Sequence, residues 1–312
     1  TNITVQHIEQ GHVFDLEIHV YYEQEHASVR IVDTHTNIVQ IEKNWQVIFE
    51  DKTTSLELKA DHSALIMKQI WDFSQTVDID DVKEILDRQI TCNMAIANEG
   101  IHNSYGANIG HVILNMDSDC VKTRAKAYAA AGSDARMNGC ELPVVINSGS
   151  GNQGITCCVP VVVYAKELDC TQEQLYRALV LSNLTAIYIK TGIGTLSAFC
   201  GAVSAGAAAG AGIAYLHNGT YKEIQHTIVN ALAILSGTIC DGAKASCAAK
   251  IASSVDAGIM GYYMYKNKQQ FYAGDGIVAH SVDETIQNIG TLGSQGMLQT
   301  NDKIIEMMIS CD

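Results

Sequence analysis

The sequence has little proline and few basic residues. Only two of its 312 residues are proline, and no low-complexity linker separates its parts. The 20 lysines and arginines are outnumbered by 34 acidic residues, which gives a net charge of −14. Such a chain would repel a phosphate backbone, and no basic cluster offsets the imbalance. We therefore expect no nucleic-acid partner.

Small and apolar residues are abundant instead. The chain has 25 glycines and long alanine-rich runs, a composition that favours closely packed helices. Residues 196–216 carry no charge over about the length that crosses a bilayer. Because alanine and glycine bury little apolar area, we interpret this segment as a buried helix and expect no membrane contact. The ten cysteines are not spaced like a secreted disulfide scaffold, which favours reduced thiols in a cytoplasmic protein.

The hydrophobic pattern changes along the chain. Residues 1–50 alternate with period two and contain β-branched and aromatic residues, which predicts an antiparallel sheet beginning with the segment 3–10. Beyond about residue 55 the period becomes helical. We expect an α+β, mainly α protein with a β-rich segment at 1–55 and a helical domain at 56–312. Helices are predicted at 62–74, 79–98 (with Asp78 as N-cap), 118–131, 152–166, 171–189, 196–216, 221–238, 245–266, 282–290 and 301–309.

A glycine- and serine-rich loop lies between two apolar runs. A helix that starts there would present free amide groups, which can seat a carboxylate or another small anion. The loop lacks the lysine of a GxxxxGK[ST] phosphate-binding motif. On its own it is equally a turn with a capped helix. The candidate substrate-binding residues are Asn147, Ser148, Gly149, Ser150, Gly151, Asn152 and Gln153.

Two cysteines flank an Asp-Gly pair. Cys240 and Cys247 on one unbroken helix would lie about 10 Å apart along the axis, too far for one compact site. Gly242 can end a helix that carries Cys240, and a second helix can begin near Ala245. Cys200, placed on the alanine-rich helix, could bring a third sulfur to the same point.

Three interpretations of these cysteines remain open. Three thiolates with a free fourth position suit a catalytic [4Fe-4S] cluster. Zinc could use the same sulfurs, although the CxxC pairs usual in zinc sites are absent. They could also be core residues, as we expect for Cys157 and Cys158, because free cysteine behaves as a small hydrophobe. Cys92, Cys120, Cys140 and Cys170 have no companions at ligand spacing.

Taken together, the motifs resemble those of a known family. The segments NSGSGNQGI at 147–155, KTGIGTLSAFCGAVSAGAAAGAG at 190–212 and GTICDGAKASCAAKIA at 237–252 resemble the alpha-chain domain of iron-sulfur L-serine dehydratases, and most closely its L-cysteine desulfidase branch. The resemblance implies a [4Fe-4S] cluster on Cys200, Cys240 and Cys247 without pyridoxal phosphate, with Cys311 as a candidate fourth ligand. It also implies that the 148–153 loop receives a small amino acid, with backbone amides and Asn152 holding its carboxylate.

The implied reaction is a β-elimination that converts L-cysteine to pyruvate, ammonia and sulfide. L-serine is the alternative substrate, and a catalytically incomplete metal-binding subunit is the non-enzymatic alternative. Desulfidases of the family carry a Cys-Thr-Glu-Pro segment that this sequence lacks, so we expect either that this chain is the carboxy-terminal portion of a longer protein or that it has lost that activity. A homodimer is a separate expectation. The catalytic base is unassigned. His102, in a polar loop with His111, and Lys190 are the weak candidates.

Overall fold

A computed structural model describes residues 2–6, 14–33, 36–51, 61–194 and 196–310. The chain divides into two compact units. One comprises Thr1–Asp61 with Lys303–Asp312, and the other is His62–Asp302. The first contains a four-stranded sheet and the second is built of helices, which confirms the α+β, mainly α class. The division falls within the final helix.

The sheet is an antiparallel meander of β1 (Asp15–Tyr22), β2 (Glu25–Val32), β3 (Ile38–Lys43) and β4 (Gln46–Glu50), paired in chain order. Alternating β-branched and aromatic residues form these strands, and short turns with left-handed residues connect them. Asn44 and Trp45, for example, have φ of 49° and 67°. The strand expected at 3–10 is absent from residues 2–6, and its remainder lies outside the described residues.

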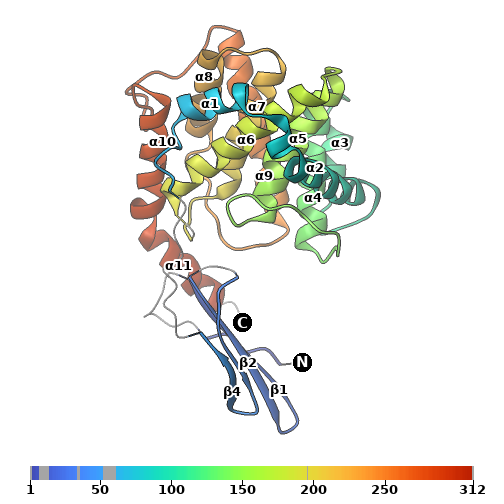
Figure 1. Cartoon of the computed structure of the whole chain (residues 1–312), viewed down its shortest axis with the longest axis vertical. Helices are drawn as coiled ribbons and strands as arrows, with labels where there is room; N and C mark the ends of the chain where they lie inside the picture. Colours follow the sequence, from blue (N-terminus) through green and yellow to red (C-terminus); the bar gives the residue numbers. More distant parts are fainter. Residues whose placement is uncertain (1, 7–13, 34–35, 52–60, 195, 311–312) are drawn as a thin grey trace. The chain divides into compact units, whose positions relative to one another are not determined.

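Helices form almost all the regular structure of the second unit (Figure 1). They are α1 (Met67–Thr76), α2 (Ile79–His102), α3 (Ile109–Met116), α4 (Val121–Met137), α5 (Gly151–Glu167), α6 (Gln172–Ile193), α7 (Gly201–Leu216), α8 (Tyr221–Ile234), α9 (Ser246–Lys266), α10 (Val282–Thr291), the π-helical turn η1 (Leu292–Gly296) and α11 (Leu298–Ile309). The Asp78 side chain caps α2 as predicted, accepting a hydrogen bond from the Asp80 amide at 3.1 Å.

The alanine-rich helix α7 is the centre of the helical core. It packs against α5, α6, α8 and α9, and nearly all of its residues are buried. A Cβ atom at Gly210 would lie 2.6 Å from the carbonyl oxygen of Gly258 in α9, so only glycine permits this approach. The close packing expected of this segment is therefore present. Within the described residues, no helix is both long and apolar enough to cross a membrane.

The prediction that His102 and His111 lie in a polar loop is wrong. The polar stretch around His102 and His111 is mostly helical: His102 is the last residue of α2, and His111 lies in α3. Its asparagines and glycines suggested a loop, but the Asp134 carboxylate accepts a hydrogen bond from the Ile109 amide at 2.7 Å and stabilises the start of α3. That contact joins residues distant in sequence, so the local pattern does not reveal it.

Candidate active site

A short strand-like pairing brings two of the proposed cysteines together. Phe199 and Ile239 form an isolated antiparallel bridge. The Cys200 amide donates to the Thr238 carbonyl at 3.2 Å, and the Cys240 amide donates to the Ala198 carbonyl at 2.6 Å. Both cysteines therefore lie in extended backbone. This corrects the prediction that each is carried on a helix.

Cys200 is the N-cap residue of α7, so the helix begins at Gly201 and not at the predicted residue 196. The Ala202 amide, in the first turn of α7, hydrogen-bonds to the Cys200 sulfur. The sulfur is thus held at the positive end of a helix, where negative charge is stabilised.

The thiols of Cys200 and Cys240 are hydrogen-bonded to each other. This contact lowers the pKa of Cys240 to about 6, against the opposing effect of burial, with help from the Gly242 amide, Lys250 and Lys190. The same contact, together with burial, raises the pKa of Cys200. One proton is therefore shared by two sulfurs in a positively charged environment, which favours a thiolate at neutral pH.

Two lysines surround this pair. Lys190, near the end of α6, is largely buried; burial lowers its pKa, while the two cysteines act in the opposite direction. Lys250, in α9, donates to the Ile239 carbonyl at 2.9 Å and forms an ion pair with Asp241. Asp241 also pairs with Lys244, and its hydrogen bonds to these two lysines lower its pKa to about 2. Asp241 is therefore a fixed counter-ion of Lys244 and Lys250.

The Cys247 thiol contacts the backbone at Gly242, two residues after Cys240. Cys247 lies in the first turn of α9, as predicted, and its thiol donates to the Gly242 carbonyl at 3.6 Å. Gly242 has φ of 96°, which favours glycine, and its amide points to the Cys240 sulfur. The Gly242 backbone therefore contacts both sulfurs, that of Cys240 through its amide and that of Cys247 through its carbonyl.

The three sulfurs do not form a compact single-ion site. Within the described ranges, no group of three or more His, Cys, Asp or Glu side chains is placed to hold a metal ion. An iron-sulfur cluster is larger than one ion, and its thiolates attach to different irons. The residues that could hold such a cluster are Cys200 and Cys240, whose thiols interact, and Cys247, whose thiol donates to the Gly242 carbonyl.

The glycine- and serine-rich loop closes on itself before α5. Asn147 and Ser150 form a bridge, and Ser148 and Gly149 between them have φ of 48° and 78°. Ser150 is the N-cap residue and accepts from the Gln153 amide at 3.4 Å. The Gly154 amide donates to the Ser150 carbonyl at 3.1 Å, so the amides of Gly151 and Asn152 are the ones left without an acceptor inside the helix. The anion seat that the sequence predicts would rest on these two amides and stays a prediction.

Asn147 anchors this loop. Its side chain is buried and donates to the Asn183 carboxamide at 3.0 Å, while its own oxygen accepts from Ser148 at 2.8 Å. Asn183 in turn exchanges hydrogen bonds with Gln89 at 2.8 Å. The polar groups of Asn147 are therefore used inside the protein, so this residue shapes the loop and is not free to contact a ligand.

Gln153 joins the loop to the cysteines. A Cβ atom at Gly201 would lie 2.7 Å from the Gln153 carboxamide carbon, so that side chain lies directly against the residue after Cys200. The Gln153 side-chain oxygen is buried and has no hydrogen-bond partner among the described residues. The loop and the Cys200 end of the cysteine group are thus adjacent, although they are about 50 residues apart in sequence.

Sequence reasoning missed Arg136 altogether. It lies in the last turn of α4, where its Nη1 atom donates to the Asn152 side chain at 3.3 Å. A Cβ atom at Gly151 would lie 2.2 Å from its Nε atom, so the guanidinium group rests on the start of α5. The glycine at 151 was a usable signal, because it marks a close approach.

The remaining candidates lie elsewhere or in the core. The His102 ring contacts the Asn98 carbonyl at 2.7 Å in its own helix, with no recorded contact to the cysteines or the loop. Cys311 lies outside the described residues. Cys157 and Cys158 are fully buried in α5, as expected of core residues.

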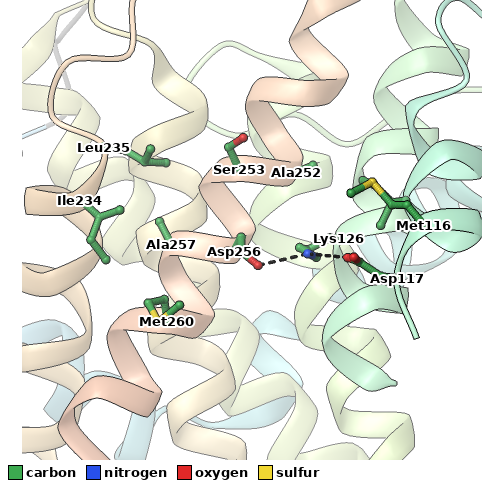
Figure 2. A pocket seen from close by; sticks show the side chains of 11 residues that line it. Met116, Asp117, Lys126, Ile234, Leu235, Ala252, Ser253, Asp256, Ala257 and Met260 are labelled. Carbon is green, nitrogen blue, oxygen red and sulfur yellow. Dashed lines mark hydrogen bonds and ion pairs between the residues drawn. The ribbon is translucent and has the colours of Figure 1, made fainter. Parts of the chain in front are cut away.

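A pocket of about 380 Å³ lies between α3, α4, α8 and α9. Figure 2 shows Lys126 between Asp117 and Asp256, at 3.2 Å from each, with Met116 and Met260 on either side. None of its lining residues belongs to the loop or the cysteine group. The pocket in Figure 2 is therefore formed by other residues than the candidate site.

Comparisons with known proteins identify the family of this chain. The family model of the serine dehydratase alpha chain matches residues 16–306. A UPF0597 protein of Desulfitobacterium hafniense is 55% identical over 99% of this chain and 73% of its own length. The UPF0597 protein of Lachnoclostridium phytofermentans is 52% identical over 90% of this chain and 68% of its own length.

A more distant UPF0597 protein, from Fusobacterium nucleatum, is 40% identical over 95% of this chain and 73% of its own length. No solved structure matches the chain. The family model alone spans most of the sequence, including the loop, Arg136 and the three cysteines. The chain therefore belongs to the serine dehydratase alpha chain family, a family of lyases that act on amino acids.

Proposed function

We propose that this protein is a [4Fe-4S]-dependent lyase that eliminates the β-substituent of a small L-amino acid, with L-cysteine as substrate. The supporting observation is one of geometry: Cys200 and Cys240 interact through their thiols, and the Gln153 side chain of the glycine- and serine-rich loop packs against Gly201, the residue after Cys200. The proposed metal ligands and the proposed carboxylate seat would thereby be adjacent. A β-elimination requires both, one for the leaving group and one for the amino-acid end.

Cys200, Cys240 and Cys247 would hold the cluster. The lysines beside them fit this role, because the positive charges of Lys190 and Lys250 stabilise thiolates. Three protein ligands leave one iron open, and the bound cluster supplies a Lewis acid for the leaving sulfur. The Gly242 amide and the first turn of α7 offer hydrogen bonds to sulfur in the same small region.

The residues of the chain orient the substrate and stabilise charge. The start of α5 binds the carboxylate, which directs the side chain of the substrate toward the cysteines. Removal of the Cα proton and cleavage of the C–S bond release sulfide and aminoacrylate, which water converts to pyruvate and ammonia. Of the two candidates for proton transfer, Lys190 belongs to this region, whereas His102 is engaged with its own helix.

L-serine is the second candidate substrate, and the family description favours it. The same elimination applies, with a C–O bond broken in place of the C–S bond. A soft thiolate binds iron more readily than hydroxide does, which favours cysteine. The cysteine-rich site itself binds the cluster and does not discriminate between the two.

The test is a turnover assay on anaerobically reconstituted protein. With L-cysteine we expect pyruvate and sulfide in equal amounts, and with L-serine at most a slower release of pyruvate alone. Pyruvate from L-serine at a higher kcat/KM than from L-cysteine would replace the first proposal with the second. No pyruvate from either substrate, with a full cluster present, would contradict both.

A further inference from the structure

We infer that Arg136 recognises the α-carboxylate of the substrate, an inference that rests on the proposed function and assigns its carboxylate specificity to one side chain. Within the described residues, Arg136 has no ion-pair partner, although other arginines do: Arg124, on the same helix, pairs with Asp119 and Glu167. A half-buried guanidinium without a carboxylate loses solvation and gains little in return. Burial accordingly lowers the pKa of Arg136.

The guanidinium faces a seat for an anion. Its Nη1 atom contacts Asn152 at 3.3 Å, and its Nε atom lies over Gly151, where no side chain intervenes. Gly151 and Asn152 are the first two residues of α5, whose amides have no acceptor within the helix. A carboxylate there would accept hydrogen bonds from the helix start and from the planar guanidinium together.

One further group fixes where the rest of the ligand would extend. Among the described residues, the Gln153 side-chain oxygen is buried with no hydrogen-bond partner, which makes it an acceptor for an ammonium group. That side chain lies against Gly201, the residue after Cys200. A zwitterionic α-amino acid bound by its carboxylate at Arg136 would therefore direct its β-carbon toward the cysteines.

Arg136 is thus a substrate-binding residue, and its substitution should weaken binding of acids but not of amides. We expect Arg136→Met to raise the dissociation constant for L-cysteine about 10- to 100-fold, the range of a lost charge-assisted hydrogen bond. Arg136→Lys should lose less, because it keeps the charge without the planar fork. Binding of L-cysteinamide, which has no carboxylate, should be equal in wild type and Arg136→Met.

Calorimetric titration of the reconstituted protein with L-cysteine and L-cysteinamide measures this selectivity, and the cluster-free protein titrated with L-serine gives a readout independent of turnover. Arg124→Met is the matched control, since it removes an arginine from the same helix outside the site. Thermal unfolding of each variant identifies any general loss of structure.

Each outcome decides the inference. Unchanged L-cysteine binding in Arg136→Met, or equal losses for the acid and the amide, would overturn it while turnover by the wild type leaves the proposed function standing. A wild-type protein that neither binds L-cysteine nor releases pyruvate would overturn the proposed function, and this inference with it. Loss confined to the acid supports the assignment.

Discussion

Cys158 and Cys240 are the same residue type in one helical unit, and their surroundings give them opposite chemistry. Cys158 is fully buried among apolar side chains in α5, where burial raises its pKa well above the ordinary value. Cys240 meets a second thiol, a backbone amide and two lysines, and its pKa falls to about 6. The difference shows that the groups around a cysteine in the folded protein, more than its position in the sequence, decide whether it can bind a metal.

The largest contrast should appear in turnover. Cys240→Ser removes a proposed cluster ligand, so we expect elimination of L-cysteine to fall to background, a loss on the order of 1,000-fold or more. Cys157→Ala, in the buried pair, should change the rate by less than about threefold, because its thiol makes long, weak contacts, to the Gly154 carbonyl at 3.5 Å and to the Asn183 side chain at 3.4 Å. Steady-state sulfide release from both variants measures the difference, and similar losses in the two would erase the contrast.

Alkylation of the cluster-free protein should sharpen the same contrast. Cys120 is exposed, and hydrogen bonding to Thr123 lowers its pKa. We expect iodoacetamide at neutral pH to modify Cys120 at least about 100-fold faster than Cys157, which is fully buried with a pKa raised to about 12. Peptide mass spectrometry over time gives both rates. Modification of the folded protein at Cys157 on the timescale of Cys120 would show that α5 is not packed as described.

Lys190 tests the contribution of charge to the cysteine group. Lys190→Met removes a cation that interacts with Cys200 and Cys240, and we expect iron to be lost to a chelator about tenfold faster, the effect of roughly 1.4 kcal/mol of charge stabilisation. Lys190→Arg should keep the wild-type rate. Lys166→Met, an exposed change in α5, is the control. Equal rates in all four proteins would remove Lys190 from the site.

The smallest effect concerns stability at high pH. The pKa of Cys157 is about 12 in the folded protein and about 8.5 when unfolded, so above pH ~8.5 only the unfolded chain releases this proton. Its contribution is complete below that pH and should decline by about 1.4 kcal/mol per pH unit above it. Cys157→Ala should therefore lose stability less steeply between pH 8.5 and 10 in urea unfolding. Parallel curves for the two proteins would contradict the burial of this thiol.

The sequence predicted the parts of this site that depend on local chemistry. The helix start near Cys247 and the loop before α5 follow from glycine conformation and N-cap residues, which act within a few positions. Gly242 does not end a helix that carries Cys240, because α8 already ends at Ile234. The α+β class followed from the change in hydrophobic period. The family model confirmed the resemblance that the motifs indicate.

Other parts depend on contacts between distant residues, which the hydrophobic pattern does not contain. The bridge between Phe199 and Ile239 places Cys200 and Cys240 in extended backbone, where helical periodicity predicted helices. Arg136 in α4 contacts Gly151 in α5, and the sequence around Arg136 does not indicate this contact. His111 was assigned to a loop because the helix start at Ile109 is stabilised by Asp134, 25 residues away.

The central claim is that Cys200, Cys240 and Cys247 hold one iron-sulfur cluster. Iron and acid-labile sulfide, counted per chain after anaerobic reconstitution, test it most directly when the three Cys→Ser variants are measured beside Cys157→Ala. We predict about four of each in wild type and in Cys157→Ala, and a marked loss in every one of the other three. Full iron and sulfide in any of those three variants, or none in wild type, would contradict the claim.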